Sequence, residues 1–89
     1  MSDEQQDIME FPCQFPIKAM GLAKPELQEI ILGIVQRHAP ETEAQHLREK
    51  PSKNGKYISI TVTIEAISRA QLDAIYIELN SSDHIVMTL

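Results

Sequence analysis

The sequence predicts a small α+β domain, and three observations lead to that expectation. Residues Tyr57 to Ala66 alternate between apolar and polar side chains, which is the period-two pattern of a half-buried strand. The pair Asn54-Gly55 stands shortly before this strand and readily adopts the positive φ angles of a hairpin turn. Ser68 follows the strand, where a helix is expected to open. Hairpin, long strand and helix in this order form the second half of a compact α+β domain.

The first half should supply one strand and one helix. Alternation predicts a strand from about Gln14 to Met20, and Gly21 should end it. A helix is expected from Pro25, which suits a first turn because its missing N–H would have no partner there. Pro40 disfavours helical angles at the residue before it, so the helix should stop near His38. Its buried side is marked by an apolar stripe at helical spacing: Leu27, Ile30, Ile31, Ile34 and Val35.

Residues 42–50 are polar and poorly patterned, yet the turn behind them requires a strand that pairs with residues 57–66. A charged strand of this kind suits the edge of a sheet, where it discourages pairing with other chains. The second helix should begin with Ser68 as its N-cap and Gln71 reaching back in a capping box. Asn80 is a candidate left-handed residue at its end.

A final strand is expected over residues 85–89, with Ile85, Met87 and Leu89 facing the core. The order βαββαβ with right-handed crossovers predicts a ferredoxin-like sandwich. Its four-stranded antiparallel sheet should have the order 4-1-3-2, with both helices on one face. This domain should cover residues 11–89, after a flexible polar tail over residues 1–10. The bare sheet face is expected to carry Lys18, Met20, Tyr57, Ser59, Thr61, Thr63, Val86 and Thr88.

Composition excludes several functions. The 89 residues suffice for one domain, and a net charge of −5 argues against DNA or RNA as the main partner. No apolar run is long enough to cross a bilayer, and the polar N-terminus does not resemble a signal peptide. A single cysteine cannot form an internal disulfide. We therefore expect a cytoplasmic protein that binds neither nucleic acid nor membrane.

Half of the basic residues fall within nine positions around the hairpin turn: Arg48, Lys50, Lys53 and Lys56. They can form a solvated hairpin tip, or they can form a contact surface for an acidic partner. Both interpretations fit the sequence.

No residue pattern indicates catalysis or a metal centre. RNA-binding domains of this architecture stack bases on aromatic residues of the central strands, and Tyr57 is the only candidate ring. Three histidines lie at no ligand spacing: His38, His46 and His84. Cys13 has no neighbouring histidine in the sequence to activate it and should be a small buried or half-buried hydrophobe rather than a nucleophile. We expect no enzyme, no metal and no cofactor.

The loop after the first strand allows two interpretations. Gly21 can simply permit the turn into the helix, or it can let a ligand approach the backbone, as in ACT-type regulatory domains. Lys24 is the only cation of this loop and can be a solvated residue at the helix start. Phosphate chemistry of the acylphosphatase type would need an arginine here, which the loop lacks.

Several short motifs keep the order and spacing of a known family: Glu10-Phe11-Pro12, Lys18-Ala19-Met20-Gly21, Pro25-Glu26-Leu27, Val35-Gln36-Arg37-His38-Ala39-Pro40, Lys50-Pro51-Ser52, Gly55 with Tyr57, Ser59-Ile60-Thr61-Val62, and Met87 with Leu89. Through them, residues 8–89 resemble the YbeD-like family of small bacterial proteins of unknown function. The resemblance implies a ferredoxin-like fold similar to the ACT domain of phosphoglycerate dehydrogenase, and it implies no activity. Thr88 departs from the family, where an apolar residue would fit, and is expected to face solvent.

Two functions remain as expectations. The first is a non-enzymatic protein-interaction or regulatory module with an unidentified protein partner, whose surface would include Arg37, His38, Lys53, Tyr57, Ser59 and Thr61. Arg37 and His38 can instead compensate the helix dipole. The alternative is an ACT-like homodimeric sensor that binds a small metabolite of the amino-acid type near Gly21 and Lys24.

Overall fold

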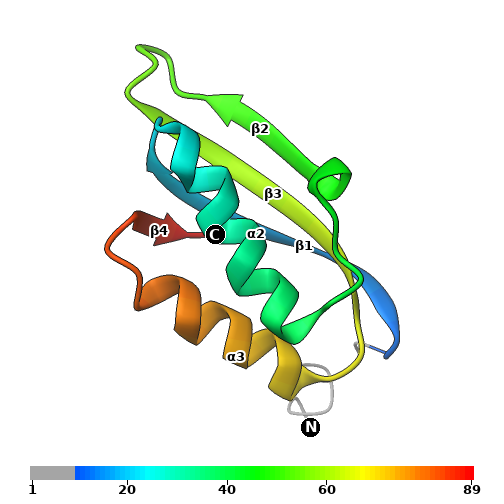
Figure 1. The fold of residues 1–89 in the computed structure, drawn as a ribbon. Helices are drawn as coiled ribbons and strands as arrows, with labels where there is room; N and C mark the ends of the chain where they lie inside the picture. Colours follow the sequence, from blue (N-terminus) through cyan, green and yellow to red (C-terminus); the bar gives the residue numbers. More distant parts are fainter. Residues whose placement is uncertain (1–9) are drawn as a thin grey trace, which may run out of the picture.

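A computed structural model describes residues 10–89, so nearly all of the expected tail lies outside the described residues. The elements follow the predicted order βαββαβ (Figure 1). They are β1 (Cys13–Leu22), α2 (Pro25–His38), a 3₁₀ turn η1 (Ala44–His46), β2 (Leu47–Pro51), β3 (Tyr57–Ala66), α3 (Arg69–Asn80) and β4 (Ile85–Thr88).

The sheet is antiparallel throughout and has the order β2-β3-β1-β4, which is the predicted order 4-1-3-2. Both helices lie on one face of the sheet (Figure 1). The ferredoxin-like sandwich is thereby confirmed. We call the face opposite the helices the open face.

The core lies between the helices and the sheet and is aliphatic. Residues predicted to be buried are buried: Ile31, Ile34, Ile60, Val62, Ile75 and Leu79. Cys13 is a half-buried free thiol packed against this core, as expected. Pro16 is tolerated inside β1 because β4 pairs only with Ala19 to Gly21, so β1 has no neighbour on one side at Pro16.

The prediction that Gly21 ends the first strand was wrong. Gly21 is buried within β1 and lies opposite Ile58 on one side and Ile85 on the other. A Cβ atom at this position would stand 2.3 Å from the carbonyl oxygen of His84 and 2.9 Å from a methyl group of Leu27. The glycine is needed because the chain entering β4 crosses it closely, not because the strand must stop.

The register of β4 differs from the prediction. Its pairing with β1 shifts between Met20 and Gly21, so one residue is inserted in β4 between Ile85 and Met87. A bulge of one residue moves the following side chains to the opposite face. Met87 therefore lies opposite Met20 on the open face, whereas Thr88 lies opposite buried Ala19 on the helix face.

The local signals at helix and strand ends were partly correct. Ser68 caps α3 by accepting the backbone N–H of Gln71. The Gln71 side chain reaches back, but it accepts the N–H of Ile67 instead of that of Ser68. Asn80 is the last residue of α3 and is not left-handed, because among residues 10–89 only Gly55 has a positive φ.

The edge strand is shorter than predicted. It begins at Leu47 because the 3₁₀ turn occupies the residues just before it. The hairpin to β3 is a loop of residues 52–56 in which Gly55 has a φ of 78°. Its backbone is held by bonds from the N–H of Tyr57 to Ser52 Oγ and from the N–H of Lys56 to Asn54 Oδ1.

Candidate interaction surface

Strand β3 runs through the middle of the open face and presents small hydroxyl side chains there. Ile60 and Val62 are fully buried on the helix face, so the residues that alternate with them project from the open face. The predicted bare-face residues of β3 are placed as expected: Tyr57, Ser59, Thr61 and Thr63.

Three cations flank this central strand. Arg48 lies opposite Thr61 and Lys50 lies opposite Ser59 across the β2–β3 pairing. Lys18 lies opposite Thr61 on the other side, in β1. We call Lys18, Arg48 and Lys50 the basic trio. All three residues lie beside Ser59 or Thr61, which are neighbours on the open face of β3. Their positive charges are therefore concentrated over one short stretch of surface.

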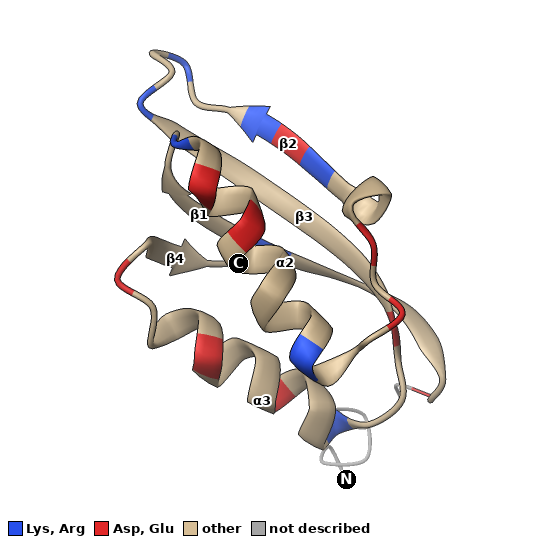
Figure 2. Ribbon diagram, in the orientation of Figure 1, with Lys and Arg blue, Asp and Glu red and all other residues tan. Residues whose placement is uncertain are grey.

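Acidic residues of the strands are kept away from the basic trio. Glu49 separates Arg48 from Lys50 in the sequence, but it lies opposite buried Ile60 and therefore faces the helix side. Figure 2 shows this alternation along β2, with one acidic residue between two basic ones. In the four described strands the only open-face carboxylate is Glu65, opposite Gln14 at the far end of the sheet. The open face is thus locally basic on a chain with a net charge of −5.

An apolar strip adjoins the basic trio on the β1–β4 side. It consists of Met20, Leu22, Met87 and Leu89, which the register places on the open face. Leu22 is 41% exposed, Met87 45% and Leu89 60%. The backbone N–H of Leu89 binds the carbonyl of Lys18, which fixes the end of the chain beside the trio.

The hairpin tip contributes charge but no ordered contact to this surface. Lys53 is an exposed loop residue beyond the ends of β2 and β3. Lys56 places its Nζ 5.5 Å from the ring centroid of Tyr57, which is a cation–π distance. Tyr57 is half-buried at the end of β3, so its ring is not available over the centre of the sheet.

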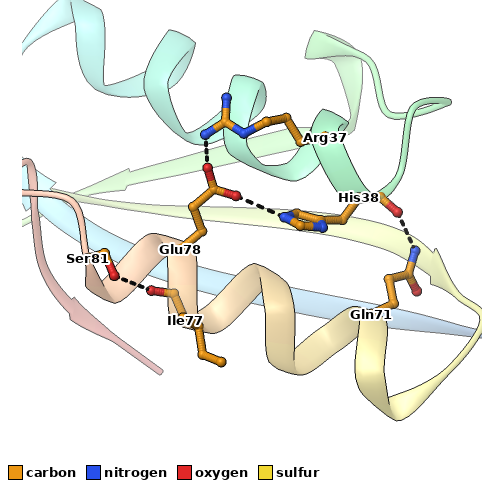
Figure 3. A network of polar contacts seen from close by, with 6 residues as sticks. All are labelled: Arg37, His38, Gln71, Ile77, Glu78 and Ser81. Atoms are coloured by element: carbon orange, nitrogen blue, oxygen red, sulfur yellow. Dashed lines mark hydrogen bonds and ion pairs between the residues drawn. The ribbon is translucent and has the colours of Figure 1, made fainter.

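Arg37 and His38 join the two helices to each other (Figure 3). Both bind the carboxylate of Glu78 in α3: Arg37 through its guanidinium, and His38 through Nε2 at 2.9 Å. Gln71 Nε2 also donates to the carbonyl of His38 at 2.9 Å, which satisfies an acceptor at the end of α2. The sequence suggested helix-dipole compensation or a partner surface for this pair, and the structure adds a carboxylate partner within the same chain.

The same contacts set the electrostatics of Glu78. Hydrogen bonds from Arg37, and to a lesser extent from His38, lower the pKa of the Glu78 carboxyl below its ordinary value. The carboxylate is therefore favoured in the folded state. This cluster is an internal helix–helix contact on the side of the molecule away from the open face.

Lys24 lies beside two hollows at the opposite end of α2. It is the N-cap of α2 but makes no side-chain cap. One hollow of about 430 Å³ is lined by Lys24, Gln28, Glu49, Ile58 and Ile60, among others. A second, of about 180 Å³, lies between Lys24 and His84. Gly21 is covered by His84 and Leu27, so its backbone does not form an open loop there.

Within residues 10–89, no group of three or more His, Cys, Asp or Glu side chains is arranged to hold a metal ion. None of the helices formed by these residues is long and apolar enough to span a membrane.

The sequence indicates most parts of this surface but not their arrangement. It predicts a group of basic residues near the turn, and it places Lys18, Ser59 and Thr61 on the bare face. Nothing in the sequence brings these residues into one cluster. Met87 was assigned to the core because the bulge gives no sequence signal. Glu78 was missed as the partner of Arg37 because the two are 41 positions apart.

Comparison with known proteins agrees with the family resemblance of the sequence. The family described as "Protein of unknown function (DUF493)" matches residues 6–89. A UPF0250 protein of Vibrio cholerae is 48% identical over 83 residues, which cover 93% of this chain and 88% of that protein. A UPF0250 protein of Neisseria gonorrhoeae is 40% identical over 82 residues, covering 92% and 90%.

A solved structure supports the fold. The solution structure of protein HP0495 from H. pylori matches with a TM-score of 0.75, covering 100% of this chain and 93% of that one. Its sequence identity is 22%, so the likeness concerns the fold alone.

Proposed function

We propose that the chain, which belongs to the DUF493 family of proteins of unknown function, is a non-enzymatic protein-interaction module that binds an acidic partner protein on its open face. The observation that carries the proposal is the basic trio. Lys18, Arg48 and Lys50 stand around Ser59 and Thr61 with no strand carboxylate among them, although acidic residues outnumber basic ones in the whole chain.

The chemistry of the face suits carboxylates. Arginine and lysine donate charge-assisted hydrogen bonds, and the hydroxyls between them offer further donors. Complementary charge of this kind raises the rate of encounter and selects against like-charged partners. Among residues 10–89, most other exposed charges are acidic, so the open face would be the surface to which an acidic partner is steered.

A protein partner fits this face better than a nucleic acid does. Three cations would neutralise few phosphates, and the remaining negative charge of the chain would repel a polyanion. Base stacking needs exposed rings on the central strands, whereas Tyr57 is half-buried at the end of β3 and carries Lys56 over its ring.

The proposal is tested by capture with matched charge reversals. The variant Arg48→Glu/Lys50→Glu reverses two charges on the open face, and the control Lys24→Glu/Arg69→Glu makes the same change in net charge at the starts of the two helices. We expect acidic cytosolic proteins to be retained by the wild type and by the control at about 0.15 M salt and lost from the open-face variant. Equal capture by all three proteins would contradict the proposal.

The second candidate, an ACT-like sensor of an amino-acid-type metabolite, is favoured by the 430 Å³ hollow beside Lys24. Its volume lies in the range of small-molecule sites, and its lining combines apolar Ile58 and Ile60 with the charged side chains of Lys24 and Glu49. A metabolite that binds there should raise the melting temperature of the wild type and not that of Lys24→Ala. Gly21→Val is unsuitable for this test, because its side chain would collide with the His84 backbone.

A further inference from the structure

The shape and chemistry of the open face point to a particular kind of partner. We propose that the open face binds an amphipathic α-helix with one acidic flank and one apolar stripe, lying along β3. This inference rests on the proposed function and specifies the segment that the acidic partner would present.

The first argument is the shape of the face. The β3 side chains at its centre, Ser59 and Thr61, are short, whereas long side chains stand on both neighbouring strands: Arg48 and Lys50 on β2, and Lys18 and Met20 on β1. From the lengths of these side chains we infer a shallow trough along β3. Two inter-strand spacings give a width of about 10 Å, which matches the diameter of an α-helix of about 10–12 Å.

The second argument concerns backbone hydrogen bonds. The backbone groups of β3 are already paired with β2 on one side and with β1 on the other. A segment lying over the middle of the face therefore finds side chains only and must satisfy its own N–H and C=O groups as water is excluded. A helix satisfies them internally, whereas an extended segment does not.

The third argument is the division of the face into two chemistries. The β2 side of the trough carries Arg48 and Lys50, and the β1–β4 side carries the apolar strip around Met20 and Met87. Among residues 10–89, six large hydrophobic side chains are exposed, and four of them lie at this side of the sheet: Leu22, Val86, Met87 and Leu89. Exposed apolar residues gathered beside a polar rim mark interaction sites, and flexible methionines adapt to varied apolar surfaces.

These dimensions specify the helix. The open face of β3 from Tyr57 to Thr63 spans six residue steps, roughly 20 Å, which corresponds to roughly 14 helical residues, and the trough occupies its middle at Ser59 and Thr61. Apolar residues at i, i+3, i+4 and i+7 would contact Met20 and Met87. Glutamates on the adjoining flank would lie over Arg48 and Lys50. Lys18 lies on β1 beside Met20, across β3 from Arg48, and would set the rotation of the helix.

The test uses two synthetic peptides of the same composition. One, of about 14 residues, places leucines in a single helical stripe and glutamates on one flank, and the other is permuted so that no stripe forms. Binding to the full chain is measured by fluorescence anisotropy, and the contacted residues are mapped by amide chemical shifts. We expect the amphipathic peptide to bind at least about tenfold more tightly, which corresponds to about 1.4 kcal/mol, because a buried apolar anchor contributes at least this much.

Two variants separate the halves of the face. Met87→Gln should remove the preference for the amphipathic peptide and leave the affinity of the permuted peptide unchanged. Because Met87 is exposed, its replacement should not disturb folding. Arg48→Glu/Lys50→Glu should weaken both peptides, and Lys24→Glu/Arg69→Glu, at the starts of the two helices, should weaken neither. Unchanged melting temperatures confirm that each variant is folded.

Other outcomes overturn the inference in distinguishable ways. If the two peptides bind with equal affinity and change the amide chemical shifts of open-face residues, the proposal of a helical partner segment is refuted. The proposal of an acidic partner is then retained. Binding of neither peptide would refute the helix, and the capture experiment then decides the proposed function separately. Tighter binding of a uridine oligonucleotide on the same face would refute both, because the partner would be a nucleic acid.

Discussion

The two faces of the sheet differ in almost every property, although the same four strands form them. On the helix face, β3 presents Ile60 and Val62, which are completely buried, and on the open face it presents Ser59 and Thr61. The helix face is aliphatic and closed, whereas the open face combines hydroxyls, cations and methionines. The comparison teaches that the residues of one face hold the domain together, whereas those of the other are not needed for its core.

The difference between the two faces is tested most directly by replacing two neighbouring residues of β3, one from each face. Ile60→Ala should destabilise the domain by about 2–5 kcal/mol, because it removes buried methyl groups and leaves a cavity. Thr61→Ala, one position further on, should cost less than about 1 kcal/mol. Urea unfolding of both variants measures the difference. Similar losses would mean that the open face also carries the stability of the fold.

The next effect concerns the close crossing at Gly21. Gly21→Ala should destabilise by about 1–3 kcal/mol, because the new Cβ would stand 2.3 Å from the His84 carbonyl oxygen and the backbone must shift. Gly33→Ala is the matched control: nothing lies within 4 Å of its Cβ position, and alanine favours the interior of α2 by about 0.5–1 kcal/mol. Opposite signs in thermal unfolding are expected, and a neutral Gly21→Ala would refute the crowding argument.

Charge reversal on the open face should have a smaller effect on stability. Arg48→Glu/Lys50→Glu is expected to change the free energy of unfolding by no more than about 0.5 kcal/mol, because both side chains are exposed. Differential scanning calorimetry at neutral pH measures this. A large loss would show that the basic trio supports the fold, and the reduced capture of acidic proteins could then no longer be attributed to the surface.

The smallest expected effect belongs to the helix layer and depends on pH. Arg37 and then His38 lower the pKa of Glu78, so their contribution is present above the unfolded-state pKa of about 4.5 and is lost as pH falls through the lower folded-state value. The melting temperature of the wild type should exceed that of Glu78→Gln at pH 7, and the difference should shrink with acidification. A constant difference would show that the carboxylate charge contributes nothing to the helix contact.

Local residue patterns determined the elements of this protein. The alternation over Tyr57–Ala66 gave the bounds of β3, and Pro25 with Pro40 gave those of α2. The sheet order followed from the succession of elements and the rule of right-handed crossovers. These features could be predicted because hydrophobic periodicity and proline geometry act over a few residues.

Tertiary structure alone decided which residues meet. The chain entering β4 crosses Gly21, and a bulge turns Met87 outward, because both depend on how a distant strand arrives at β1. Glu78 meets Arg37 only through the packing of α3 on α2. The sequence by itself placed Lys18, Arg48 and Lys50 on strands, but strand pairing set their register and gathered them around Thr61, because cross-strand neighbours are separated along the chain.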